Sequence, residues 1–320
     1  MWSLVARLPL VARRRVAALL APAAAAFVAL GSFGGYRYVD NFWVYRGFAP
    51  PQDPAFVTQR GTAIRFYVRS GAIGGRSQPV DVYLPPGYAD HPAQRYPVLY
   101  LLHGFPGKPG AFLLTVKLGV DEDVLVAQQR MQPVILVMPF GSTGQFTDRE
   151  WANGVRPNEG WATFMARDVV RAVDARFRTI DTGAGRALGG LSEGGYGAIN
   201  IALHHPGEFG VVESWSGYEL ADPDRSIFGG DARLLDDNSP LRLLPKVAPA
   251  LRRDHTYFWF YVGSTDGQRM RQENEEFAAQ LTRRRIPHRF FVVYGGHNWA
   301  VWRDHGTEAL LAAAAHLTHA

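Results

Sequence analysis

The chain has no cysteine and almost no lysine. Without cysteine, a protein of 320 residues can hold no disulfide, no thiolate metal site and no cysteine nucleophile. Its lysines are Lys108, Lys117 and Lys246, so arginine carries nearly all of the positive charge. The sequence also lacks HExxH, GxxxxGK[ST] and a GxGxxG after an early apolar run. It therefore predicts no metal and no nucleotide cofactor.

The positive charge does not indicate a nucleic-acid partner. The net charge is +5 and the pI is about 9.5. However, Arg7 and Arg13–Arg15 lie in an N-terminal segment outside the predicted domain, and the remainder is close to neutral. The short run Arg283–Arg285 lies near the end of an expected helix, where cations suit the helix dipole. We expect no binding to nucleic acid.

The N-terminal segment has the order of a targeting sequence. Arg13–Arg15 directly precede the apolar stretch Val16–Phe33, which is about as long as the roughly 17 to 25 residues of a membrane-spanning helix. The positive-inside rule would place the rest of the chain outside the cytoplasm. Ala29-Leu30-Gly31 suits a signal-peptide cleavage site, whereas the aromatic residues that follow favour retention. The sequence predicts a signal peptide or membrane anchor, with the domain anchored at the cell membrane or secreted.

Composition divides the chain into three parts. Residues 1–35 form the signal peptide or anchor, and residues 36–58 form a linker that is rich in aromatic residues and proline, including Ala49–Pro54. Residues 59–320 form the folded domain, and 47% hydrophobic residues in the whole chain suffice for a large core. No internal repeat is present in the sequence.

The pattern of apolar residues predicts an α/β fold. Residues 62–69 and 79–84 suit an antiparallel hairpin, and the continuous apolar runs 96–102 and 133–138 suit strands buried on both faces. Further strands are expected at 211–215, 257–262 and 290–294, and helices at 161–177, 271–284 and 307–317. This alternation predicts a doubly wound, mostly parallel sheet with an antiparallel N-terminal hairpin. Residues 217–251 are poorly periodic and form either a cap-like insertion or a long surface excursion.

The segment Gly190-Leu191-Ser192-Glu193-Gly194 stands between a short apolar strand and a helix rich in small residues. A GxSxG in this setting is typical of the nucleophile elbow of an α/β-hydrolase fold. The elbow is a sharp turn, and its glycines let other backbone segments approach without a Cβ in the way. The alternative is a chance match in a glycine-rich loop, because the chain has 34 glycines.

A serine nucleophile needs a base and an orienting carboxylate, and in this fold they follow in the order Ser, Asp or Glu, His. Asp266 follows an expected strand in Gly263–Gly267, and His297 follows the last one in Gly295–Trp299. We expect Ser192, Asp266 and His297 to form a catalytic triad. Competing residues lie earlier in the chain, inside helices or near the C-terminus: His204, His205, His305, His316, His319, Asp231, Asp236, Asp237, Glu273, Glu275 and Glu276.

The intermediate of such a reaction needs preorganised N–H donors. One donor is expected to be the backbone N–H of Glu193, and the second that of Phe105 in the loop His103–Gly107. Pro106 has no N–H to donate. His103, at a strand end beside this loop, is expected to form structural hydrogen bonds rather than to act as the base.

Three ordered segments give the domain a resemblance to a known family. With "LLHGFPG" at Leu101–Gly107, "GLSEGGYGA" at Gly190–Ala198 and "GGHNWAVW" at Gly295–Trp302, it resembles the Putative esterase family of α/β-hydrolases. That family includes feruloyl and acetyl xylan esterases, S-formylglutathione hydrolases and antigen 85 mycolyltransferases. "EWANG" at Glu150–Gly154 adds to the resemblance, which covers roughly Arg60 to the C-terminus.

The resemblance implies hydrolysis of a carboxylic ester, small or linked to a polysaccharide, through an acyl-serine at Ser192 and without a metal or organic cofactor. Two alternatives stay open. The same fold could carry an envelope acyltransferase, since hydrolysis and transfer share the acyl-enzyme and differ in the acceptor. The domain could also be a catalytically silent surface-binding protein.

Overall fold

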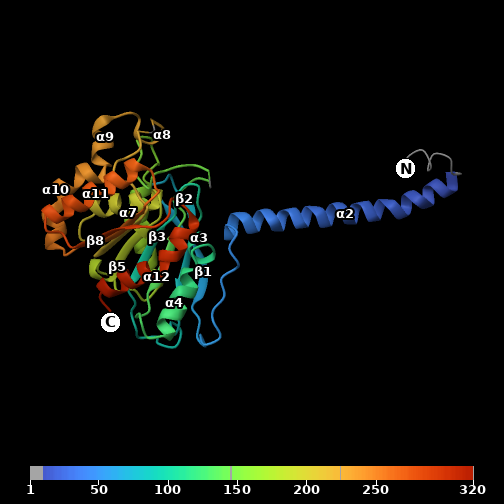
Figure 1. Cartoon of the computed structure of the whole chain (residues 1–320), viewed down its shortest axis with the longest axis horizontal. Coiled ribbons are helices and arrows are strands. Elements are labelled where there is room, and N and C mark those ends of the chain that lie inside the picture. Colours follow the sequence, from blue (N-terminus) through green and yellow to red (C-terminus); the bar gives the residue numbers. More distant parts are fainter. Residues whose placement is uncertain (1–9, 145, 224, 320) are drawn as a thin grey trace. The chain divides into compact units, whose positions relative to one another are not determined.

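A computed structural model describes residues 10–144, 146–223 and 225–319 of the chain (Figure 1). The chain divides into two compact units, residues 1–49 and 50–320. The first unit contains the helix α2 (Leu10–Tyr45), which has Pro22 in its interior. The predicted boundary at residue 35 falls inside this helix, and residues 1–9 of the predicted signal or anchor lie outside the described residues. Among the residues described, no helix is both long and apolar enough to span a bilayer.

The second unit is built on an eight-stranded sheet in the order β1-β2-β4-β3-β5-β6-β7-β8. β1 pairs antiparallel with β2, and β2 pairs antiparallel with β4, whereas β4 and β3 and all later neighbours pair in parallel. The predicted α/β-hydrolase fold with its N-terminal hairpin is confirmed. The strands are β1 (Thr62–Ser70), β2 (Arg76–Leu84), β3 (Val98–Leu102), β4 (Ile135–Pro139), β5 (Arg186–Gly190), β6 (Val211–Trp215), β7 (Tyr257–Gly263) and β8 (His288–Val293).

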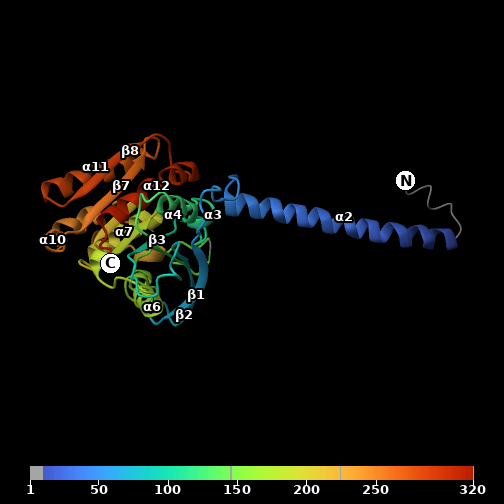
Figure 2. The same cartoon turned by 90° about the horizontal axis from the view of Figure 1, so that it is seen from below.

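Helices cover both faces of this sheet (Figure 2). α4 and α12 pack on one face, and α6, α7, α10 and α11 lie on the other. The helices are α3 (Ala111–Leu114), α4 (Leu118–Ala127), α5 (Trp161–Thr163), the π-helix Phe164–Val169, α6 (Val170–Arg176), the 3-10 helix Gly183–Gly185, α7 (Glu193–His204), α8 (Arg225–Phe228), α9 (Ala232–Asp237), α10 (Pro240–Arg253), α11 (Gln268–Arg283) and α12 (Trp299–His316).

Alternation along the strands divides the core between these two faces. In β7, Trp259 and Tyr261 belong to the cluster under α12, whereas Phe258 and Phe260 belong to the cluster under α10 and α11. Successive side chains of a strand point to opposite faces, so a strand covered on both sides must be apolar at every position. This is why the continuous apolar runs predicted buried central strands.

Residues 217–251 form the part of the chain whose structure differs most from the sequence-based prediction. α10 packs on α7 and α11, and its Leu243, Leu244 and Leu251 are buried in the core. Pro245 and Pro249 lie inside this helix, and proline is normally a sign that a helix has ended. The amphipathic spacing of the leucines outweighs that signal, so the second half of the region is a core helix rather than a surface excursion.

Two other helices differ from expectation. The segment predicted as one helix over 161–177 contains a π-helical turn over Phe164–Val169, although its aromatic side chains are buried as expected. α12 begins at Trp299, eight residues before the predicted Thr307. Asn298 explains the early start, because its side chain accepts hydrogen bonds from the N–H groups of Ala300 and Val301.

Glu213 is a carboxyl group inside the apolar core. It lies in β6 on the same face as Trp215, is 0% exposed, and has one oxygen that accepts from Trp215 Nε1 at 3.1 Å. Burial raises the pKa of Glu213 to about 8. The unfolded chain loses this proton near the ordinary pKa of about 4.5, so the folded state binds more protons over the range between the two values.

We therefore expect stability to fall as pH rises from about 4.5 to 8 through this group. Glu213→Gln keeps the acceptor for Trp215 and removes the ionisation. It should be close to wild type in thermal unfolding at pH 5 and more stable at pH 8.5, by roughly 3 to 5 kcal/mol at most. Glu276→Gln, at an exposed carboxylate, is the control. An equal effect of Glu213→Gln at both pH values would contradict the assignment.

Candidate active site

The turn after β5 has the geometry of a strained elbow. Ser192 has φ 57° and ψ −124°, and its N–H donates to Trp215 O at 2.9 Å. A Cβ on Gly190 would overlap the carbonyl of Gly194, and one on Gly194 would overlap the carbonyl of Leu102. Glycine is therefore required on both sides of Ser192 because three backbone segments meet there. The steric role predicted for these glycines is confirmed.

Two glycine-containing loops at the ends of β7 and β8 bring Asp266 and His297 together. Thr265 N–H donates to Gly295 O at 2.8 Å, and Gly295 N–H donates to Ser264 Oγ at 3.2 Å. Gly295 has φ +123°, a conformation that side chains other than glycine rarely adopt. The paired loops place His297 beside the carboxylate that follows the neighbouring strand.

The three predicted triad residues lie next to one another, with His297 between Ser192 and Asp266. Ser192 Oγ and His297 Nε2 are 2.7 Å apart, a hydrogen-bond distance. His297 Nδ1 lies 3.8 Å from Asp266 Oδ1, which is longer than a hydrogen bond. The Asp266 side chain is 0% exposed, whereas that of His297 is 36% exposed. The site therefore joins a buried carboxylate to a serine at the surface.

Asp266 is held as a carboxylate although it is buried. Burial raises its pKa, but interactions with the His297 imidazole, the Gly263 N–H and the Ser216 hydroxyl outweigh burial, so the pKa is lowered. The Gly263 N–H donates to Asp266 Oδ2 at 2.9 Å, which fixes the orientation of the carboxylate. An ionised Asp266 can stabilise a positive charge on His297.

The two predicted N–H donors belong to segments that meet beside Ser192. Glu193 begins α7, and among the described residues neither its N–H nor that of Phe105 donates to an acceptor. The loop of Phe105 approaches the elbow closely, because a Cβ on Gly104 would lie 2.9 Å from Ser192 Cβ. The N-terminus of a helix favours negative charge, so this corner can bind an oxyanion.

His103 has the structural role that the sequence predicts. It is 4% exposed, its Nε2 accepts from the Gly141 N–H at 3.2 Å, and its Nδ1 lies 2.9 Å from Gly104 O. Burial lowers the pKa of His103 to about 4, so the imidazole is neutral at physiological pH. Trp151 Nε1 donates to His103 O at 2.9 Å and packs its ring against the imidazole.

Ser192 lines a cavity of about 420 Å³, a volume typical of small-molecule sites. The cavity is lined by Phe105, Asp148, Glu150, Ser192, Glu193, Tyr218, Leu220, Asp222, Gly267, Arg269, Met270 and Glu273. Sequence reasoning did not identify most of these residues. Tyr218, Leu220 and Asp222 belong to the irregular region after β6, where no local pattern marks a binding surface.

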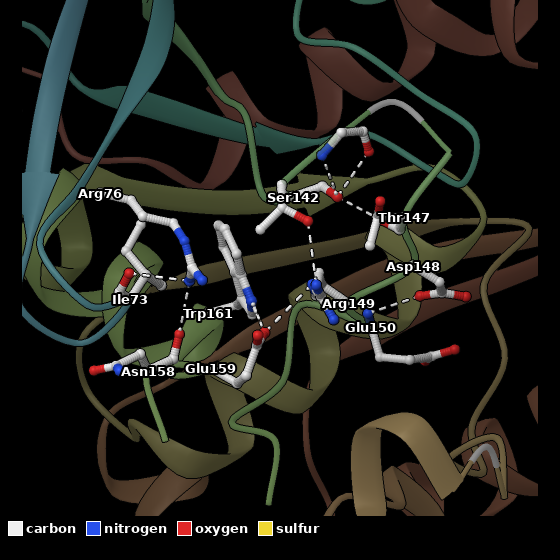
Figure 3. A network of polar contacts seen from close by, with 12 residues as sticks. Ile73, Arg76, Ser142, Thr147, Asp148, Arg149, Glu150, Asn158, Glu159 and Trp161 are labelled. Carbon is white, nitrogen blue, oxygen red and sulfur yellow. Dashed lines mark hydrogen bonds and ion pairs between the residues drawn. The ribbon is translucent and has the colours of Figure 1, made fainter. Parts of the chain in front are cut away.

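Asp148 and Glu150, from the loop between β4 and α5, line this cavity. Figure 3 shows the polar contacts of that loop. Arg149 turns toward Glu159, 3.3 Å away, and Glu159 accepts from Trp161 Nε1 at 2.8 Å. Asp148 accepts from the Glu150 N–H at 2.9 Å. Glu150 also accepts from Tyr218 Oη at 2.6 Å, which joins this loop to the one after β6.

The competing residues serve other roles. Asp231 caps α9, and Glu273 Oε2 accepts from the N–H groups of Glu219 and Leu220. His204 Nδ1 lies 2.8 Å from Asn200 O at the end of α7. In the part of the chain described, no group of three or more histidine or acidic side chains is arranged to hold a metal ion.

The fit of the elbow can be tested at Gly194. In Gly194→Ala the new methyl group overlaps the carbonyl of Leu102 and forces β3 and the Phe105 loop away from the turn. We expect a loss of about 1 to 3 kcal/mol of stability and a far larger loss of reaction with a serine-directed probe. Gly71→Ala adds the same methyl group where nothing lies within 4 Å and should behave as wild type. Undiminished reactivity in Gly194→Ala would show that the close approach is not needed.

Known proteins are similar to this domain in sequence and in fold. An endo-1,4-beta-xylanase/feruloyl esterase of Xylanibacter ruminicola is 32% identical over 157 residues, which is 47% of this chain and 21% of that protein. An esterase of Mycobacterium tuberculosis is 28% identical over 251 residues, covering 68% of this chain and 52% of that protein. The chain thus matches about half or less of the length of these curated relatives.

A solved structure of a ferulic acid esterase superposes with a TM-score of 0.69 at 23% identity, covering 81% of this chain and 99% of that one. The sequence profile of the family described as Putative esterase matches residues 70–313. That range includes the elbow, both triad loops and the Phe105 loop. The chain belongs to the Putative esterase family.

Proposed function

We propose that the domain is a serine hydrolase of carboxylic esters that acts through an acyl-serine at Ser192. The observation that carries the proposal is the 2.7 Å distance between Ser192 Oγ and His297 Nε2 on a strained elbow. Membership of the Putative esterase family supports the reaction class. The buried Asp266 and the N–H groups of Glu193 and Phe105 would supply the remaining parts.

In the proposed reaction, His297 Nε2 takes the Ser192 proton as Oγ bonds to the ester carbonyl carbon. The negative charge then moves to the carbonyl oxygen, where the N–H groups of Glu193 and Phe105 stabilise it. Asp266 stabilises the imidazolium across 3.8 Å. Collapse of this tetrahedral intermediate breaks the bond between the carbonyl carbon and the alcohol oxygen. The alcohol then leaves with the proton from His297.

The acyl group is then bonded to Ser192, and deacylation repeats the same steps with water. His297 takes a proton from the water, whose oxygen bonds to the acyl carbon, and then returns that proton to Ser192. The elbow keeps Oγ at the cavity surface throughout, because φ of Ser192 points the side chain away from the helix that follows.

A fluorophosphonate probe should label the wild type and fail to label Ser192→Ala, because the probe bonds to the activated serine. Hydrolysis of a p-nitrophenyl ester should fall by about 10⁴-fold or more in the same variant. Ser77→Ala, in an exposed position of β2, is the matched control and should label fully. Labelling of Ser192→Ala to the wild-type level would refute the assignment.

We also propose that the domain is exported. The proposal rests on Arg13–Arg15 preceding the apolar stretch Val16–Phe33. Residues 1–58 fused to alkaline phosphatase, which is active only after export, should give activity in a bacterial host. The same fusion with Arg13–Arg15 changed to glutamate should lose most of that activity. Comparable activity of a fusion lacking residues 1–35 would count against export by this segment.

A further inference from the structure

His103 contacts the loop that carries the second predicted N–H donor. Its side chain is buried, and its Nε2 accepts from the Gly141 N–H at 3.2 Å. A ring nitrogen that accepts a hydrogen bond carries no proton, and in a neutral imidazole the other nitrogen carries it. Burial lowers the pKa of His103 to about 4, so the imidazole is neutral at physiological pH and Nδ1 is the protonated atom.

This proton fixes the direction of one peptide group. The Nδ1–H of His103 donates to Gly104 O at 2.9 Å, and that carbonyl belongs to the same peptide group as the Phe105 N–H. The peptide bond between Gly104 and Phe105 is trans, and in a trans peptide the C=O and the N–H are coplanar and point in opposite directions. The hydrogen bond to Gly104 O therefore turns the Phe105 N–H away from the buried imidazole.

This peptide group lies beside the proposed nucleophile. Phe105 lines the cavity together with Ser192 and Glu193, and a Cβ on Gly104 would lie 2.9 Å from Ser192 Cβ. Among the residues that the structure describes, no acceptor takes the Phe105 N–H. A donor that is turned out of the core beside a nucleophile suits the negatively charged oxygen of a reacting substrate.

Packing holds the imidazole in this orientation. The ring contacts Phe140 and Trp151, with centroid distances of 5.4 and 5.1 Å. Trp151 Nε1 donates to His103 O at 2.9 Å, so the same indole also fixes the backbone of His103. A Cβ on Gly107 would lie 2.1 Å from Gly104 O and 2.9 Å from His103 Nδ1. The loop therefore closes tightly around this hydrogen bond and has room only for glycine there.

The same tryptophan contacts the helix that carries the first predicted donor. Trp151 is buried, and a Cβ on Gly197 of α7 would lie 2.5 Å from Trp151 Cβ. Glu193, whose N–H is the other predicted donor, is the first residue of α7. Both predicted donors thus belong to segments that pack against one buried indole, and His103 lies between that indole and the peptide group of Phe105.

We propose that His103 is a positioning residue of the oxyanion site, because its Nδ1–H holds Gly104 O and thereby directs the Phe105 N–H to the carbonyl oxygen of a bound ester. The proposal rests on the proposed ester hydrolysis at Ser192 and deepens it by stating what orients one of the two donors. His103 does not line the cavity and takes no proton in the reaction. The oxyanion forms only after Ser192 attacks, so a misdirected N–H lowers kcat more than it changes KM.

Two substitutions separate the two hydrogen bonds of the imidazole. The amide nitrogen of asparagine takes the place of Nδ1, so His103→Asn keeps a donor for Gly104 O and loses the acceptor for Gly141. The longer glutamine reaches the place of Nε2, so His103→Gln keeps that acceptor and loses the donor. For p-nitrophenyl butyrate we expect kcat to fall about 10- to 100-fold in His103→Gln, with KM changed by less than about twofold. His103→Asn should stay within about threefold of the wild-type kcat.

A transition-state analogue gives a second readout. Trifluoromethyl pentyl ketone bonds to a reactive serine and then carries an oxyanion, so its Ki should rise in His103→Gln by about the factor by which kcat falls. His204→Gln is the matched control, since it also removes a histidine whose Nδ1 lies beside a backbone carbonyl, 2.8 Å from Asn200 O, and it should leave kcat and Ki unchanged. Equal kcat and Ki in His103→Gln and His103→Asn, or a loss of thermal stability without a change in kcat and Ki, would overturn the proposal.

The proton on the imidazole can be observed in the wild-type protein. In nitrogen NMR spectra with isotope-labelled histidine, the signals missing from His103→Asn belong to His103. They should show a protonated Nδ1 and an unprotonated Nε2 at physiological pH, because the pKa of His103 is about 4. A proton on Nε2, or titration near the ordinary pKa of about 6.5, would overturn the positioning role and leave the esterase intact. A wild type that neither hydrolyses esters nor is labelled at Ser192 would reject both.

Discussion

At the carboxyl end of the sheet, the backbone of the turn after β5 touches the backbone that leaves β3. Gly190, Gly194 and Gly104 lie where these segments meet, and a Cβ on any of them would collide with a neighbour. The contact sets the position of Ser192 and brings the Phe105 loop to it. The proposed nucleophile and the proposed N–H donors are therefore placed by one packing constraint, and not by separate interactions.

The positions of Asp266 and His297 depend on a second close approach of the same kind. Gly263 and Gly295 let the loop after β7 donate backbone hydrogen bonds to the end of β8 and the loop that follows it, and a Cβ on Gly263 would lie 2.6 Å from Gly295 O. Parallel strands end at the same edge of a sheet, so loops that follow neighbouring strands can pair. Trp302 also holds His297 in place, because the two rings pack edge to face with their centroids 5.1 Å apart.

These constraints explain which features the sequence could predict. The glycines beside Ser192, Asp266 and His297 can be recognised in the sequence, because glycine at these positions indicates a tight turn or a close backbone approach. Continuous apolar runs likewise indicate strands that are covered on both faces. The cavity walls carry no such signal. Tyr218 and Glu150 are 68 residues apart and meet through a single 2.6 Å hydrogen bond, which requires the whole fold. The sequence did not predict α10 because two prolines lie within it, although its leucines pack in the core.

The acidic residues around the site have a common structural origin. Irregular loops at the end of a sheet leave backbone N–H groups without strand partners, and each buried donor needs an acceptor. Asp266 accepts from Gly263, Glu273 from Glu219 and Leu220, and Asp148 from Glu150.

Carboxylates do this work well because charge-assisted hydrogen bonds are strong. Asp148 and Glu273 also line the cavity beside Ser192. The N-terminus of α7 favours negative charge at the corner beside Glu193, where the proposed reaction would form an oxyanion.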